Sequence, residues 1–517
     1  MLPTGTSNQQ EFVSSDANRH FRTDHLKDDL AGRFARGGAV TIAAQALRFV
    51  IRTASTIALA RLLTPQDYGL IAMVVILVDF VSMFQHLGLS TATIKWSEID
   101  HRQVSTLFWI NVVMSAAIML VTAGCAPLLA WFYKEPRLIP ITACYAVSIF
   151  LTGVNIQHEA ILSRQMRFGA IALIELSAIV IGLAAAILAA VYGAGYWALV
   201  VNQLVMTTCT VIGVWTACRW RPGLPARGAG VRSMLSYGGH LTGFNLMNYF
   251  ARNTDNALIG KFWGAYQLGV YSRAYQLLLM PMSQINNPLV AVAVPALSRL
   301  TDSPERYRAA YLKIVEKIAM ITMPGIVFMI AMSDSLVLFL LGPQWREAGR
   351  IFMLLGVAAI IQPVTRTVPW LFTTQGRARE MFKWGIAGSV IAVASILGGL
   401  RWGAAGVAAS YAATDLCIAT PLLFWYAGRR GPVRTKDFYR VIAPSVCASL
   451  CALAALLLCR AWLAALPNLL ARLSLAFAIT AVVSIVVLAA LPAGRLAMRN
   501  LKDILLLLLR PKRESVA

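Results

Sequence analysis

Arginine side chains interrupt several apolar stretches of this 517-residue sequence. Arg48 and Arg52 are four residues apart in the first such stretch, so in a helix they share one face. Arginine stays charged at neutral pH and binds phosphate oxygens through paired hydrogen bonds. An ionisable side chain at the centre of a membrane helix costs about 2.5–3.5 kcal/mol, so it usually faces a cavity or a partner. The pattern indicates a cationic cavity that suits an anionic ligand.

Other arginines and several asparagines extend this candidate substrate site. Asparagine is a poor helix former and is costly in lipid, so its face of a helix is expected to point into protein or water. The alternatives are an arginine that pairs with an acid or extends to the membrane surface, and asparagines that pack between helices. The candidate substrate-binding residues are Arg48, Arg52, Arg252, Arg273, Arg366, Asn245, Asn248 and Asn253.

Acidic residues in the apolar stretches are candidates for coupling to an ion. Asp255 lies three residues after Arg252, so the two side chains can pair, either as a switch or as a permanent structural contact. Asp79 and Glu175 are candidate ion-coupling residues, and each is equally a candidate partner for Arg48 or Arg52. Asp334 and Asp415 also fall in predicted spans, and the sequence assigns them no role.

The composition places these residues in a membrane protein. Apolar residues make up 58% of the chain and charged residues 13%, against about 25% charged in soluble proteins. The mean hydropathy is +0.66, which excludes a soluble enzyme and a disordered chain. The net charge of +23 would suggest a nucleic-acid partner in a soluble protein. Most basic residues lie in short gaps between apolar stretches, so membrane topology explains them and no nucleic acid is expected.

Fourteen apolar stretches are long enough to span a bilayer as helices. If the N-terminus is inside, the predicted inside segments hold 31 of the 46 Lys and Arg residues. The predicted outside segments, with the span ends that border them, hold nine. This bias predicts that both termini are cytoplasmic. The expected spans are 39–60, 69–90, 104–132, 138–162, 169–191, 196–217, 235–259, 267–296, 314–340, 351–374, 384–400, 403–426, 441–460 and 470–492.

The spans suggest a division into two lobes and two flanking tails. The expected segments are a cytoplasmic N-terminal tail (1–38), an N-lobe (39–218), an interlobe loop (219–234), a C-lobe (235–426), two further helices (441–492) and a basic amphipathic tail (493–517).

Two short matches predict an internal repeat. Gly37-Gly38-Ala39-Val40-Thr41 recurs as Gly238-Gly239-His240-Leu241-Thr242, at an offset of 201. After the first and seventh predicted helices, Gly69 and Gly269 correspond at an offset of 200. Six helices separate the copies, so both have the same orientation, as in two-lobed transporters with a central site.

Two segments carry a resemblance to a known family. They are ALARLLTPQDYGL at 58–70 and SYGGHLTGFNLMNYFARNTDNALIGKFWGAYQLGVYSRAYQ at 236–276. Over about residues 33–430 the chain resembles the Wzx-like polysaccharide transporter (PST) branch of the MOP flippase superfamily, near exporters of colanic acid and succinoglycan repeat units. The resemblance implies an all-α fold of fourteen helices in two lobes around a central cavity. It also implies an oligosaccharide on a polyprenyl diphosphate as substrate, moved to the periplasmic leaflet of the bacterial inner membrane.

Motifs for enzymatic chemistry are missing from the sequence. It has no Walker A loop, no HExxH and no GxSxG, and no predicted loop is long enough to house a glycosyltransferase. We expect a transporter with no cofactor and no metal, acting beside a polysaccharide polymerase and a chain-length regulator. A peptidoglycan-precursor flippase and an ion-coupled, multidrug-type antiporter of the same superfamily are the alternatives. A membrane enzyme of polysaccharide assembly is a further one.

Overall fold

The protein is described here from a computed structural model that covers residues 30–85, 93–94, 99–225, 232–492, 494–495 and 498. In α2 and α10 only the backbone is described at 30–40, 42, 232–248, 250–252, 285–288 and 291. All regular structure in this part of the chain is helical. The predicted amphipathic C-terminal tail falls almost wholly outside the described residues. The chain packs as two compact units, Met1–Gly269 and Val270–Ala517.

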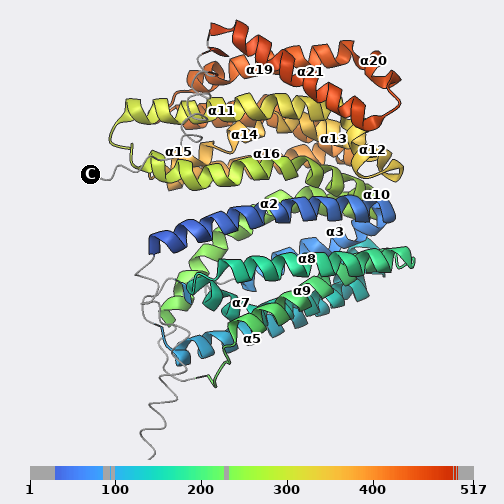
Figure 1. Ribbon diagram of the computed structural model, residues 1–517, viewed down its shortest axis with the longest axis vertical. Coiled ribbons are helices and arrows are strands. Elements are labelled where there is room, and N and C mark those ends of the chain that lie inside the picture. Colours follow the sequence, from blue (N-terminus) through green and yellow to red (C-terminus); the bar gives the residue numbers. More distant parts are fainter. Residues whose placement is uncertain are drawn as a thin grey trace, which may run out of the picture. The chain divides into compact units, whose positions relative to one another are not determined.

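The first unit is a bundle of long helices. Strongly apolar sequences such as α8 and α5 form these helices, because a helix satisfies its own backbone hydrogen bonds without water. In Figure 1, α2 runs beside α8, and α8 packs along α9. The helices are α2 (Leu30–Leu62), α3 (Pro65–Gln85), α5 (His101–Gly124), α6 (Ala126–Tyr133), α7 (Leu138–Arg164), α8 (Phe168–Val191), α9 (Trp197–Cys218) and α10 (Arg232–Ser298) as far as Gly269.

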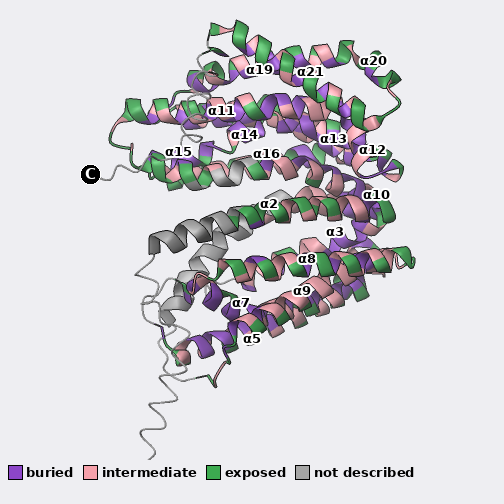
Figure 2. Cartoon of the chain, viewed as in Figure 1, coloured by how far each residue is buried: buried purple, intermediate pink, exposed green. Residues whose placement is uncertain are grey.

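The second unit begins inside α10 and contains two antiparallel pairs. Helix α16 packs along α17. Helix α19 packs along α21 (Figure 1). Exposed and buried residues alternate around these helices (Figure 2). Large apolar side chains such as Val390, Leu450 and Val482 are among the exposed ones. The helices after α10 are α11 (Pro304–Ala331), α12 (Ser333–Leu340), α13 (Arg346–Ala359), α14 (Gln362–Thr365), α15 (Val368–Thr374), α16 (Ala378–Gly399), α17 (Gly403–Thr414), α18 (Thr420–Gly428), α19 (Thr435–Leu458), α20 (Arg460–Ala465) and α21 (Leu469–Ala490).

The all-α, multi-pass architecture predicted from the sequence is confirmed. Among the described residues, nine helices are long and apolar enough to cross a membrane, and the bent pair Pro343–Ala359 and Gln362–Thr374 raises the number to ten. Helices occupy all fourteen predicted stretches, but the number of crossings stays a prediction. The seventh and eighth stretches form one element, α10, which is broken at Gly264 with φ 78°. Glycine adopts this φ without the steric cost that a side chain adds.

The first helix begins earlier than the first predicted span. Helix α2 starts at Leu30, whereas apolar residues alone predict a start near Ala39. Its first turns contain Arg33 and Arg36, which do not suit a hydrocarbon core. A helix can continue into water beyond the bilayer because its backbone hydrogen bonds stay internal. Hydropathy therefore locates the span but not the end of the helix.

The repeat-related glycines meet within the first unit. Gly69 packs so closely against Ala265 that a Cβ would overlap the Ala265 carbonyl group. A Cβ on Gly269 would likewise overlap the carbonyl group of Pro65. Both contacts join positions 65 and 69 to positions 265 and 269, in exchanged order. This reciprocal contact is what a two-fold relation between equivalent segments produces.

Candidate functional site

The first unit contains an ion pair between α2 and α8. The Nη1 atom of Arg48 lies 2.5 Å from the Oε2 atom of Glu175, and each side chain is 30% exposed. The carboxyl group of Glu159, on α7, is also within electrostatic range of Glu175. Of the two partners that the sequence left open for Glu175, the structure selects Arg48.

Arg52 lies one turn further along α2, and its environment differs. The Arg52 side chain is exposed, and its backbone carbonyl accepts a hydrogen bond from Thr56 Oγ1 at 2.9 Å. Arg48 and Arg52 therefore share a helix face, as predicted, but only Arg48 is paired with an acid among the described residues. A guanidinium group exposed on such a face can accept an anionic ligand without first breaking an ion pair.

Asp79 and Tyr249 bring α3 and α10 together. Asp79 is exposed on α3, within electrostatic range of the Tyr249 side chain. The Tyr249 hydroxyl donates to the Ile76 carbonyl oxygen at 2.6 Å, and Asn253 Nδ2 donates to the Tyr249 carbonyl oxygen at 3.1 Å. One predicted polar residue, Asn253, thus has its side chain tied to its own helix.

Beside Tyr249 lies an apolar cavity of about 500 Å³ that the sequence did not predict. Aromatic and aliphatic side chains from α3, α6 and α10 line it, and Tyr249, Asn253 and Thr254 supply its polar groups. Its residues come from three segments far apart in sequence, so no local pattern marks it. The lining residues include Ile76, Phe80, Leu128, Trp131, Phe132 and Leu258.

The other predicted site residues of α10 are only partly described. Asp255 is half-buried, and its Oδ1 atom accepts the backbone N–H of Asn256 at 2.8 Å. The predicted Arg252–Asp255 pair cannot be placed, because the side chain of Arg252 lies outside the described residues. The same holds for Asn245 and Asn248.

In the second unit, Arg273 and Arg366 lie on different helical segments. Arg273 Nη1 donates to Gln276 Oε1 at 2.6 Å, one turn along α10. Arg366 caps the C-terminus of the short helix α14, and its side chain is exposed. A single cavity lined by all five arginines therefore remains a prediction.

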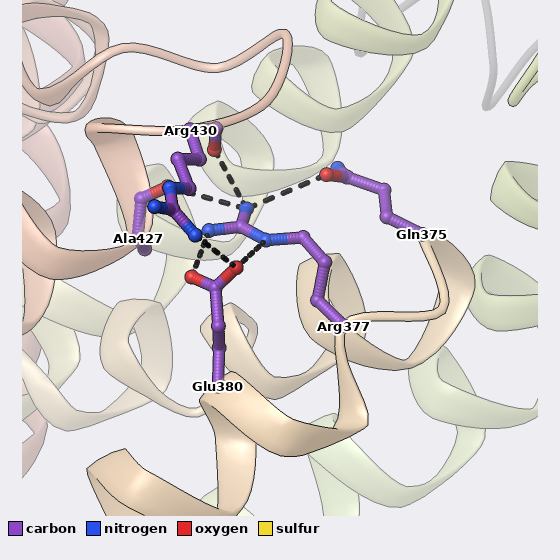
Figure 3. A network of polar contacts seen from close by, with 5 residues as sticks. All are labelled: Gln375, Arg377, Glu380, Ala427 and Arg430. Carbon is purple, nitrogen blue, oxygen red and sulfur yellow. Dashed lines mark hydrogen bonds and ion pairs between the residues drawn. The ribbon is translucent and has the colours of Figure 1, made fainter.

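Each unit also contains an arginine clasp, defined by Arg167 in the first unit and Arg377 in the second. Arg167 Nη1 donates to the Ala217 carbonyl oxygen at 2.8 Å, at the end of α9. Arg377 Nη1 lies 3.4 Å from the Ala427 carbonyl oxygen near the end of α18, and 2.7 Å from that of Arg430 (Figure 3). Helix C-termini leave unpaired carbonyl groups, which a positively charged donor satisfies.

The second clasp is more extensive than the first. Arg377 Nη2 lies 2.8 Å from Glu380 Oε2, and Arg430 Nη1 lies 3.8 Å from Glu380 Oε1 (Figure 3). The side chains of Arg377 and Glu380 are only 12% and 17% exposed. Gln375 Oε1 also accepts from Arg377 Nη1, at 3.4 Å. This network joins the turn before α16 to the loop after α18.

The sequence contains a signal for the clasps that our sequence analysis missed. Gln-x-Arg occurs at 165–167 and again at 375–377, and Trp-x-Ala-x-Arg at 215–219 and 425–429, both at an offset of 210. The turns match as well, because Met166 and Gly376 both have positive φ, 55° and 68°. The repeat therefore extends to the far ends of both halves, with nine or ten residues inserted relative to the earlier matches.

These features together define a class of protein. Long apolar helices, a structural repeat and a half-buried ion pair between α2 and α8 make this a multi-pass membrane protein of the two-repeat transporter type. The chain belongs to the polysaccharide biosynthesis protein family, whose model matches residues 58–350.

Curated relatives agree with this assignment at low sequence identity. The lipopolysaccharide biosynthesis protein WzxC of Escherichia coli (strain K12) is 24% identical over 68% of this chain and 72% of that protein. The succinoglycan biosynthesis transport protein ExoT of Rhizobium meliloti (strain 1021) is 23% identical, over 86% and 90%. The teichuronic acid biosynthesis protein TuaB of Bacillus subtilis (strain 168) is 24% identical, over 59% of this chain and 64% of TuaB.

Solved structures show the same fold. The lipid II flippase MurJ, in an inward closed conformation, superimposes with a TM-score of 0.67 at 12% identity, covering 87% of this chain and 98% of MurJ. A multidrug resistance MATE family transporter of the MOP superfamily, in an inward-facing conformation, gives 0.59 at 14% identity, covering 77% and 99%. These structures confirm the fold that the resemblance to the MOP flippase superfamily implied.

Proposed function

We propose that this protein moves polyprenyl-diphosphate-linked oligosaccharide repeat units from the cytoplasmic to the periplasmic leaflet of the inner membrane. The product would serve exopolysaccharide, capsule or O-antigen synthesis. The observation that carries the proposal is the family match over residues 58–350, to which the relatives named for polysaccharide biosynthesis and transport add weight. The fold shared with MurJ supports a flippase but does not distinguish this substrate from a peptidoglycan precursor.

The charges of the first unit support an anionic substrate. Arg52 is exposed on the face that it shares with Arg48, and Arg48 is held by Glu175. A diphosphate that approached this face would meet Arg52 first and would then compete with Glu175 for Arg48. Glu175 thereby becomes the acid that takes up a coupling ion when Arg48 turns to substrate, and Asp79 and Asp255 are the other candidates. A cationic drug would be repelled by Arg52, which disfavours the multidrug alternative.

The partners and the location form part of the proposal. The two termini would be cytoplasmic, and a polysaccharide polymerase and a chain-length regulator would receive the flipped substrate. The chain would act as a transporter and not as an enzyme.

The test measures the leaflet in which lipid-linked oligosaccharide accumulates. A deletion strain is complemented with the wild type, Arg52→Ala, Arg52→Lys or Arg102→Ala, at equal membrane expression. Arg102 is an exposed arginine near the start of α5 and serves as the matched control. We expect the deletion to trap the oligosaccharide on the cytoplasmic side, and the wild type and Arg102→Ala to clear it. Arg52→Ala should clear it at least tenfold more slowly. An unchanged lipid distribution in the deletion strain would refute the proposed function.

A further inference from the structure

Asp415 lies near the middle of the helical stretch 403–428, which forms the C-terminal part of the apolar region Ala378–Gly428. It is 12 residues after Gly403, where α17 begins, and 13 before Gly428, where α18 ends. At 1.5 Å per residue, it is about 18–20 Å from either end of this helical stretch. A carboxyl group at that depth is costly to insert and marks a functional position by default.

The helix departs from regular geometry at Asp415. Residues Asp415–Ala419 form a π-helical turn, in which the Thr420 N–H donates to the Asp415 carbonyl oxygen. Pro421 follows and has no N–H with which to continue the α-helical ladder, which explains why the bulge forms there. π-Helical turns inside α-helices occur frequently at functional sites.

The Asp415 side chain borders a cavity of about 160 Å³ that is lined by both polar and apolar side chains. Its Oδ2 atom is buried and has no hydrogen-bond partner among the described residues, and the same is true of Thr420 Oγ1. A buried carboxylate oxygen without a partner is strongly disfavoured unless a bound species satisfies it. Further hydroxyl groups line the cavity, from Thr365, Ser395, Tyr411 and Thr414.

One positive charge acts on this carboxyl group from a neighbouring element. Arg366, next to the cavity residue Thr365, attracts Asp415 electrostatically without a hydrogen bond to it. Tyr411, on α17, is the other titratable group that lines the cavity in the described part of the chain. Arg366 is therefore attracted to the Asp415 carboxylate whenever that carboxylate is ionised and no cation is bound beside it.

We propose that the Asp415 cavity is a binding site for one monovalent cation, a proton or Na⁺, and that its occupancy sets how freely Arg366 can bind an anion. Oxygen ligands suit hard cations. A single carboxylate with neutral hydroxyl groups suits one positive charge, whereas Ca²⁺ and Mg²⁺ prefer several carboxylates or phosphates. No group of three or more His, Cys, Asp or Glu residues with metal-binding geometry occurs among the described residues.

The second part of this inference rests on the proposed function. When the cation neutralises Asp415, Arg366 loses its competing negative charge and its guanidinium group becomes available for a substrate diphosphate. When the cation leaves, Asp415 attracts Arg366 again and the diphosphate is released. Cation and anion would then bind with positive cooperativity, so each would raise the affinity of the protein for the other.

Cation binding is measured on the purified full-length protein in nanodiscs, without transport. One arm measures equilibrium binding of radioactive Na⁺ at constant pH and ionic strength. The other titrates acid in sodium-free buffer and follows the infrared bands of carboxyl and carboxylate groups. We expect one arm to report a site that the wild type shares with Asp302→Asn, a control that removes an exposed acid. Asp415→Asn should lose that site, and Thr420→Val should weaken a Na⁺ site about tenfold.

The link to Arg366 is tested with farnesyl diphosphate as the probe. We expect the cation to tighten probe binding at least fivefold in the wild type, and Asp415→Asn to bind tightly with no cation. Arg366→Ala should bind the probe weakly under all conditions. Equal cation binding by Asp415→Asn and the wild type would overturn the cation site. An affinity for farnesyl diphosphate that changes neither with the cation nor with Arg366→Ala would overturn the coupling. A cation site that persists in a protein unable to flip lipid would support this inference and refute the proposed function alone.

Discussion

Arg167 and Arg377 lie 210 positions apart and make the same contact, each reaching the carbonyl oxygen of an alanine 50 residues further on. The two alanines, Ala217 and Ala427, are therefore also 210 apart. Each arginine follows a residue with positive φ and ties the start of one helix to the end of another. The repeat is thus preserved in a long-range contact as well as in local sequence.

The two clasps differ in what an alanine substitution removes. Arg167→Ala deletes a charge-assisted hydrogen bond to a helix C-terminus, which should cost about 1–2 kcal/mol. Arg377→Ala also leaves the mostly buried Glu380 with the more distant Arg430, at 3.8 Å, as its ion-pair partner, so about 2–3 kcal/mol is expected. Thermal unfolding of the purified protein in detergent, followed with a thiol-reactive dye, measures both. Equal midpoints for Arg377→Ala and Arg167→Ala would contradict the role given to Glu380.

The reciprocal glycine contact predicts that neither Gly69 nor Gly269 tolerates a methyl group. Each Cβ would overlap a backbone carbonyl group, which cannot move as a flexible side chain can. Alanine at either position should lower the unfolding midpoint by several degrees, for a cost of about 1–3 kcal/mol. Gly169→Ala is the control, because a Cβ there meets open space within α8. Unfolding midpoints for Gly69→Ala and Gly269→Ala that match Gly169→Ala would show that the backbones do not touch.

The Arg48–Glu175 pair predicts a separation of stability from transport. Glu175→Gln should cost about 1–2 kcal/mol, since it leaves a half-buried guanidinium without its counter-charge. The exchange Arg48→Glu with Glu175→Arg should restore most of that stability, because the pair is kept. Transport should remain impaired in the exchanged protein if substrate binding requires the guanidinium group to lie on α2 and not on α8. Thermal unfolding and the leaflet assay, applied to the same variants, separate the two effects, and full transport by the exchanged protein would exclude Arg48 from the substrate site.

A second ion pair, outside the membrane spans, predicts a dependence on pH. Arg137 Nε lies 2.7 Å from Glu135 Oε1, and this hydrogen bond lowers the pKa of Glu135 below its usual 4.5. A lowered pKa stabilises the fold above pH 4.5, and the stabilisation disappears as the pH falls through the folded-state pKa. Both side chains are partly exposed, so solvent limits the effect to about 1 kcal/mol or less.

Arg137→Gln tests this dependence. Its unfolding midpoint should lie slightly below that of the wild type at pH 6, and the difference should close between pH 4.5 and pH 3. Glu135→Gln should behave in the same way. A difference that persists unchanged at pH 3 would show that Arg137 contributes by packing and not through the carboxylate.

The sequence alone determined the class of this protein. Apolar length, the distribution of Lys and Arg and the matches around Gly69 and Gly269 depend on local composition, and the bilayer turns that composition into helices directly. The tertiary structure decided which charges meet. Glu175 selects Arg48 rather than Arg52, Arg167 reaches Ala217, and the cavity at Asp415 collects hydroxyl groups from several helices. These contacts depend on how helices that are distant in sequence pack and rotate against one another, and a single sequence does not encode that rotation in any local pattern.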